Sequence, residues 1–153
     1  MADVIKQGVN PVNEITFGIC ITGRPADITT AEYTVVKDAE GLTIAINGQI
    51  QEWNAMDQKG YTKRLKTANS ISITMGGKRN YGDPGNDYVA SRAFKIGQDC
   101  NSVLKITFPN GDTLYMPCVI NTTSMAGDAV AIDALQWEAL SDGKPTYVDY
   151  QSA

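Results

Sequence analysis

Apolar and polar residues alternate with a period of two along most of this 153-residue chain, and this pattern constrains the fold more than any other feature. Successive side chains of a β-strand point to opposite faces, so the alternation is typical of strands with one buried face. The apolar positions are Phe17, Ile19 and Ile21, then Leu42, Ile44, Ile46 and Ile50, then Ile71, Ile73 and Met75. We therefore expect a mainly β domain, and a hydrophobic content of 42% is enough to fill one core.

The stretch KITFPNGDTLYMPC, residues 105–118, predicts a β-hairpin with a defined register. Pro109 and Asn110 suit the centre of a type I turn, and Gly111 supplies the positive φ that closes a three-residue loop. This loop places Phe108 opposite Asp112. It also puts four apolar residues on one face, namely Leu104, Ile106, Leu114 and Met116. A two-residue Asn-Gly loop would mix the two faces, so the three-residue loop is the prediction.

Three further segments are expected to be strands. EYTVV, residues 32–36, follows the first strand, and GLTIAINGQIQEW, residues 41–53, is predicted as one long strand with Gly48 at a bulge or a close contact. An Asn47-Gly48 turn would scramble its faces. The last strand is DAVAIDALQWEAL, residues 128–140, where a slip in the apolar phase predicts a β-bulge near Asp133 and Ala134.

One segment, DPGNDYVASRAFKIG, has helical spacing instead. It predicts a short helix from about Asp87 to Ile96, with Asn86 or Asp87 as the N-cap and Gly97 just past the end. The order of strands, one helix, a hairpin and a final strand favours a β-sandwich or barrel-like domain in which the helix plugs an open side.

The connection from Asn54 to Asn69 is predicted to be a long loop, and it is rich in basic residues. Residues 53–79 hold six basic residues and one acidic residue, whereas the whole chain has a net charge of −4. Three interpretations are open: a solvated loop, a nucleic-acid patch supported slightly by Tyr61, and a tether that reaches an acidic surface on another copy of the chain. The acidity of the remaining sequence favours the tether.

Catalytic and metal chemistry have little support in this sequence. There is no histidine, which removes histidine-based acid–base catalysis and most catalytic zinc sites. Cys20, Cys100 and Cys118 are far apart and lack metal-binding spacing, so we expect buried free thiols. We expect no enzyme activity, no metal, no cofactor, no membrane span and no secretory signal.

The stretch SVLKITFPNGDTLYMPCVINTTSMAGDAVAIDALQWEALSDGKPTYV, residues 102–148, resembles the C-terminal half of the tail tube (major tail) proteins of long-tailed bacteriophages. The shared features are an aromatic-Pro-Asn-Gly hairpin at Phe108–Gly111, a return strand, a polar linker and a long strand that ends in SDGKPTY. The strands around the basic connection match more loosely, so that the resemblance covers about Leu42 to Val148. This family is related to the tube proteins of contractile tails and of type VI secretion.

The resemblance implies a single tail tube domain over residues 1–153, with an N-terminal arm (1–13), a long assembly loop (54–69) and a C-terminal tail (141–153). It implies hexameric rings that stack into a hollow conduit for DNA ejection into the host, with strands of neighbouring subunits joined into one inter-subunit β-barrel. Double-stranded DNA would pass through the lumen without specific binding. The expected partners are other copies of the chain, a tape measure protein and tail tip or terminator proteins. The location would be the virion tail, assembled in the host bacterial cytoplasm.

The candidate residues follow from the charge pattern and this resemblance together. The expected inter-subunit interface comprises Lys59, Tyr61, Lys63, Arg64 and Lys66. Four acids are expected either in the lumen or as partners of that basic segment, and the two options stay open: Glu52, Asp128, Asp133 and Glu138. The alternative function is a small nucleic-acid-binding β-barrel domain, which predicts binding of free DNA that weakens steeply with salt.

Overall fold

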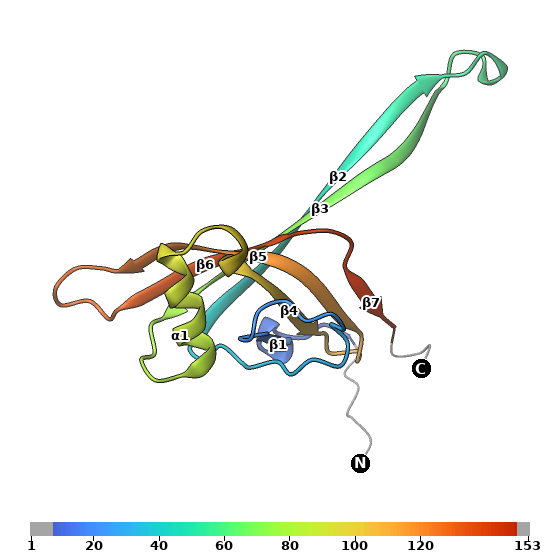
Figure 1. Cartoon of the computed structure of the whole chain (residues 1–153). Helices are drawn as coiled ribbons and strands as arrows, with labels where there is room; N and C mark the ends of the chain where they lie inside the picture. The colour runs from blue at the N-terminus through green and yellow to red at the C-terminus, as the bar shows by residue number, and fades with distance from the viewer. Residues whose placement is uncertain (1–7, 150–153) are drawn as a thin grey trace.

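The structure is a computed structural model that describes residues 8–149, and it is built on one antiparallel β-sheet (Figure 1). The sheet has the order β1-β4-β5-β6-β3-β2, and β7 pairs with the start of β5. The strands are β1 (Thr16–Ile19), β2 (Ala39–Asn54), β3 (Thr62–Lys78), β4 (Asn101–Thr107), β5 (Thr113–Ala126), β6 (Ala134–Ser141) and β7 (Thr146–Val148). One α-helix, α1 (Pro84–Ser91), accompanies the 3-10 turns η1 (Val12–Glu14), η2 (Met56–Gln58), η3 (Arg92–Phe94) and η4 (Gly97–Cys100). The expected mainly β fold with one short helix is confirmed.

The hairpin between β4 and β5 has the predicted register. Gly111 has a φ of 93° and donates its N–H to Phe108, while the Phe108 N–H binds the carbonyl of Asp112. Ile106 lies opposite Leu114, as the three-residue loop requires. The four residues of the predicted apolar face, Leu104, Ile106, Leu114 and Met116, are all buried in the core. Cys20, Cys100 and Cys118 are buried free thiols, as expected.

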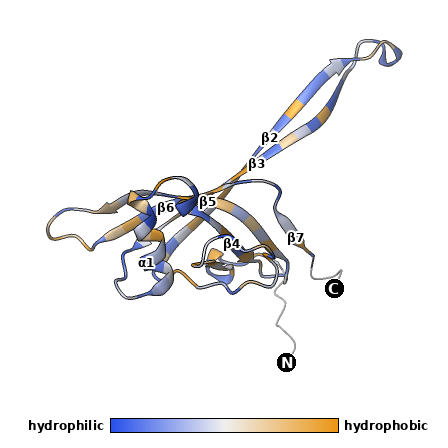
Figure 2. Cartoon of the chain, in the orientation of Figure 1, coloured by the Kyte–Doolittle hydropathy of each residue, from blue (hydrophilic) through white to orange (hydrophobic). Residues whose placement is uncertain are grey.

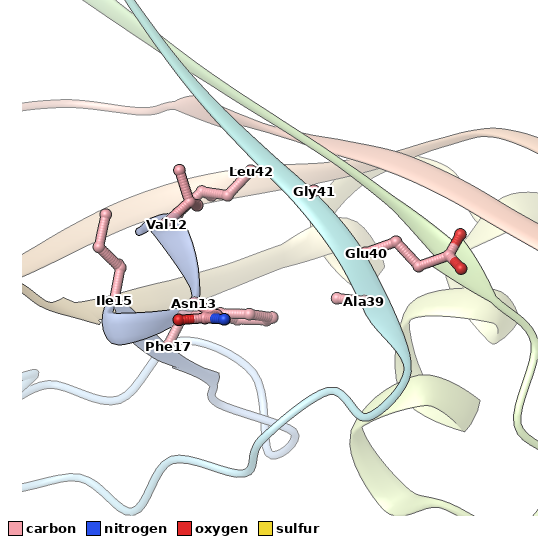
Figure 3. Close-up of a pocket in the computed structure, with 8 residues that line it drawn as sticks. All are labelled: Val12, Asn13, Ile15, Phe17, Ala39, Glu40, Gly41 and Leu42. Carbon is pink, nitrogen blue, oxygen red and sulfur yellow. The ribbon is translucent and has the colours of Figure 1, made fainter. Parts of the chain in front are cut away.

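The sheet curls so that its two edges approach each other, which makes it barrel-like. One pocket of about 260 Å³ lies between the two edges (Figure 3). It is lined by Val12 and Ile15, which precede or adjoin β1, by Phe17 of β1, and by Ala39 and Leu42 at the base of β2. Ile15, Phe17 and Leu42 also pack against the core. Mainly apolar side chains thus line the gap between the edge strands, which is not completely filled.

Helix α1 begins earlier than the predicted Asp87–Ile96, and it ends at Ser91. Asp83 is the N-cap rather than Asn86 or Asp87, because its carboxylate accepts the N–H of Asn86 and Pro84 fits the first turn. Beyond Ser91 the chain tightens into η3, and Gly97 starts η4.

Asn86 anchors the helix to the sheet. Its side-chain amide donates to the carbonyls of Lys37 and Lys78, and its oxygen accepts the N–H of Asn80 and a guanidinium N–H of Arg79. The side chain is 1% exposed, so four hydrogen bonds are made in a site that excludes water.

The segment before β2 packs closely against this helix, and it is not the expected strand 32–36. Only an isolated bridge joins Thr34 to Ile19. The chain passes so near Gly85 that a Cβ there would lie 2.4 Å from the Val35 carbonyl oxygen. Contact with α1 has therefore replaced pairing with the sheet, and Val36 is buried in the core.

Strands β2 and β3 form one long hairpin, so the prediction of a continuous strand through Gly48 is confirmed. The close contact predicted there exists, since a Cβ on Gly48 would lie 2.7 Å from Cε of Lys66. The register irregularity falls instead between Gln49 and Ile50, where Thr67 is the extra residue on β3.

Two other boundaries differ from the sequence predictions. The prediction of a loop over residues 54–69 is wrong, because Thr62 pairs with Asn54 and the connection between the strands is only residues 55–61. The prediction of a β-bulge near Asp133 and Ala134 is also wrong. Strand β6 begins at Ala134, and the irregularity lies in β5 between Thr122 and Ser124.

The chain ends fall partly outside the described residues. Of the expected N-terminal arm, residues 1–7 lie outside them, and the described part leads into η1. Of the expected C-terminal tail, Ser141 completes β6, β7 pairs with β5, and residues 150–153 lie outside the described part.

Candidate assembly surface

Residues 47–70 form a two-stranded projection, which we call the arm (Figure 1). It consists of the second half of β2, the connection with η2, and the first half of β3. Every arm residue is exposed except Ala55, which is half-buried. Several exposed side chains are large and apolar, namely Ile50, Trp53, Met56, Tyr61 and Leu65. A surface of this kind is typical of a segment that contacts another molecule.

The pairing of the two strands brings some of the predicted interface residues together. Arg64 lies opposite Glu52, and the two side chains form an ion pair at 2.7 Å. Both partners are more than half exposed, so this pair adds little stability. Lys63 lies opposite Trp53, and its Nζ is 5.9 Å from the indole centroid, within cation–π range.

The other predicted interface residues occupy different positions on the arm. Lys59 has a left-handed φ of 56° and ends η2, and Tyr61 is exposed beside it. Lys66 lies opposite Ile50, on the same face as Arg64. Sequence reasoning therefore placed the basic residues on one projecting element. It missed the strand that carries three of them and the apolar residues between them.

The four candidate acids fall in separate places. Glu52 is on the arm and pairs with Arg64. Glu138 is on β6 and accepts a hydrogen bond from the Asn121 amide at 2.8 Å. Asp133 accepts the Tyr81 hydroxyl at 3.0 Å, a contact that raises the pKa of Tyr81. Asp128 is exposed between β5 and β6. The geometry therefore does not favour one shared role for all four acids.

Glu138 lies on what we call the polar face, the side of β5, β6, β3 and β2 that is opposite the core. The strand registers place small or uncharged residues around it: Asn121, Ser124, Gln136, Ser72, Thr74, Thr43 and Ala45. Buried Ile73, Met75, Trp137 and Ala139 alternate with them on the core side. The polar face also carries Leu140, which is 37% exposed, and it has few charges near Glu138.

The same four strands have unpaired lateral edges. Within residues 8–149, β2 pairs only with β3, and β5 pairs with β4 only as far as Val119. Residues 120–126 of β5 continue beyond that point and pair only with β6. Backbone donors and acceptors of an edge that pairs with no other strand can pair with a strand of another molecule.

A second projection joins β5 to β6, and residues 127–133 form what we call the tip. Val130 is 99% exposed and Ile132 is 71% exposed. Figure 2 shows hydrophobic colour at this end of the β5–β6 hairpin. Sequence reasoning missed this surface because it assigned these residues to a strand. The signal was present, however, in the phase slip between Ile132 and Leu135.

Chemical catalysis has no obvious site in the described residues. The pocket between β1 and β2 is mainly apolar, and Glu40 points away from Val12 and Ile15 (Figure 3), forming an ion pair with Lys78 at 3.4 Å. No group of three or more Cys, Asp or Glu residues between residues 8 and 149 is arranged to hold a metal ion. No helix in that range has the length and apolar character to cross a membrane.

Comparisons with known proteins identify the fold but no sequence family. No family model and no curated protein matches the chain. Among solved structures, a chain in the tail of an empty gene transfer agent (GTA) particle, refined helically with C6 symmetry, is similar with a TM-score of 0.70 and 14% identity over 92% of this chain and 100% of that chain. A chain in the virion of a native GTA particle gives a TM-score of 0.69 at the same identity and coverage. This chain therefore has the fold of a protein found in the tail of a gene transfer agent particle.

Proposed function

We propose that this chain is the repeating subunit of a tail tube in a phage or phage-like particle. Hexameric rings of it stack into a hollow conduit for DNA ejection into a host cell. The fold supports the proposal, because the similar chain belongs to a tail with C6 symmetry. The sequence resemblance to phage tail tube proteins also supports the proposal. It is a separate line of support, because it rests on the order and spacing of short sequence motifs.

The observation that carries the proposal is the four-stranded part of the sheet with an unpaired edge on each side. If β2 of one copy pairs with residues 120–126 of β5 in the next copy, the contact repeats from subunit to subunit. Six such contacts close a ring and remove both free edges of the four-stranded part of the sheet. The exposed edges of the isolated chain are then explained as assembly surfaces.

The polar face is the candidate lining of the lumen. Small hydroxyl and amide side chains on this face offer DNA few strong contacts, and Glu138 contributes one negative charge per subunit. Repeated around a ring, these charges repel phosphates, so that DNA passes without specific binding. Of the four candidate acids, Glu138 is the one we assign to the lumen.

The arm is the candidate contact with a subunit of the adjacent ring. Its exposed apolar residues and its basic residues extend beyond the body of the chain, where only another molecule can cover them. A tape measure protein and tail tip or terminator proteins remain predicted partners, and the virion tail remains the predicted location.

Negative-stain electron microscopy of concentrated purified protein tests the proposal. The expected result is tubes or rings with six-fold symmetry. Glu138→Lys should still assemble, but its tubes should retain DNA at low salt. Glu32→Lys makes the same charge change at an exposed residue away from the polar face, and its tubes should not retain DNA. Assemblies of another symmetry would contradict the proposal.

The basic arm favours one other function, that of a small nucleic-acid-binding β-barrel. That function predicts that the monomer binds free duplex or single-stranded DNA with an affinity that falls steeply as salt rises. A tail tube subunit should bind free DNA weakly. Strong, salt-sensitive binding by a chain that forms no rings would replace the proposed function with this alternative.

A further inference from the structure

We propose that the arm of one copy docks on the β5–β6 tip of a neighbouring copy. This inference rests on the proposed function, and it names the surface that the arm contacts. The tip was not expected from the sequence, and no interaction within the described part of the chain covers its apolar side chains.

The arm and the tip both expose apolar side chains. Val130 and Ile132 lie close together on the tip, and both side chains are largely exposed to solvent. Exposed apolar side chains that cluster in this way often mark a protein–protein contact. On the arm, Ile50 lies on one face, and Trp53 and Leu65 lie on the other. Contact between the arm and the tip removes apolar area on both from water.

The charges of the two elements are complementary. Residues 127–133 contain Asp128 and Asp133 and no basic residue. On the arm, Arg64 is already paired with Glu52, whereas Lys63 and Lys66 form no ion pair with another residue of the range 8–149. The tip therefore combines acidic and apolar side chains, and the arm combines basic and apolar ones. Such a pattern selects the partner and the orientation of the contact.

The topology places the arm and the tip at opposite ends of the same strand. The pairing of β3 with β6 runs from Ser72, next to the arm, to Lys78, which lies opposite Ala134 at the base of the tip. Figure 1 shows the two projections on opposite sides of the body. They do not meet within one chain, so their contact joins two copies head to tail and repeats along a stack.

Cysteine cross-linking tests this contact directly. The native thiols at positions 20, 100 and 118 are at most 7% exposed, so introduced cysteines should react selectively. Val130→Cys is combined in turn with Ile50→Cys, Leu65→Cys or Lys66→Cys in concentrated protein, and mild oxidation follows. At least one pair should give a ladder of multimers on a non-reducing gel. The matched control, Val130→Cys with Thr43→Cys on the polar face, should give no such ladder.

The cross-linking results separate this inference from the proposed function. Tubes in the micrographs without an arm–tip ladder overturn only the inference. A ladder without rings or tubes supports the contact but counts against the six-fold tube. If neither a ladder nor an assembly is observed, both the inference and the proposed function are overturned.

A charge exchange gives an independent test. The first variant carries Lys63→Glu and Lys66→Glu on the arm, and the second carries Asp128→Lys on the tip. Each alone should raise the concentration needed for assembly at least tenfold, because equal charges then face each other. A mixture of the two should regain assembly, since the altered arm fits the altered tip and the native arm fits the native tip. A mixture no better than its components would contradict the docking.

Discussion

Deletion of the arm should separate folding from assembly. We replace residues 47–70 by Asn-Gly, a two-residue turn that joins Ile46 directly to its partner Ile71. The pairing of β3 with β6 starts at Ser72, and the core cluster contains no arm residue. The shortened chain should therefore keep its body and lose the capacity to form tubes.

The size of the stability change can be bounded from the structure. The ion pair between Arg64 and Glu52 is mostly exposed, so its loss costs less than about 1 kcal/mol. If the arm were a flexible loop, shortening it roughly tenfold would reduce the entropy cost of loop closure by about 2 kcal/mol. This value is an upper limit, because the two strands of the arm pair with each other and the arm is not a flexible loop. We expect the free energy of unfolding to lie between about 1 kcal/mol below and about 2 kcal/mol above that of the full chain.

Urea unfolding followed by circular dichroism measures this change. The arm is exposed before unfolding, so the dependence of the unfolding free energy on urea should change little. Loss of a cooperative transition, or destabilisation by clearly more than about 2 kcal/mol, would refute the reasoning, because it would make the arm part of the cooperative core. Tubes formed by the shortened chain would refute the assembly role.

Two further predictions concern the stability of the body. Asn86→Ala should cost about 3 kcal/mol in urea unfolding, because it removes four hydrogen bonds of a buried side chain, including those to the carbonyls of Lys37 and Lys78. High pH should also destabilise the fold. A hydrogen bond to Asp112 raises the pKa of Tyr147 from 10.0 to about 12, and burial raises that of Cys118 from 9.0 to about 12. The unfolded chain releases these protons first, so stability should fall as pH rises from about 9 to 12. Tyr147→Phe should reduce part of that fall, and an unchanged pH profile in this variant would count against the Tyr147 contribution.

Features governed by local chemistry were determined by the sequence itself. The Phe108–Gly111 turn set the register of β4 and β5, because the φ values required by its residues allow only one alignment that keeps the apolar side chains together. The continuity of β2 through Gly48 followed from the same matching of faces. The burial of the three cysteines and the excess of basic residues near the arm were also readable from residue type and position.

Only the tertiary structure decided the features that depend on distant partners. Thr62–Asn69 is a strand because it pairs across the arm with residues of β2, although its charged composition suggested a loop. Asp83 caps α1 because its carboxylate also meets the N–H of Lys37. The sorting of Glu52, Asp128, Asp133 and Glu138 into the arm, the tip and the polar face depends on strand pairing. Charge and hydrophobicity are properties of residues, but the surface on which they act is set by which segments the fold brings together.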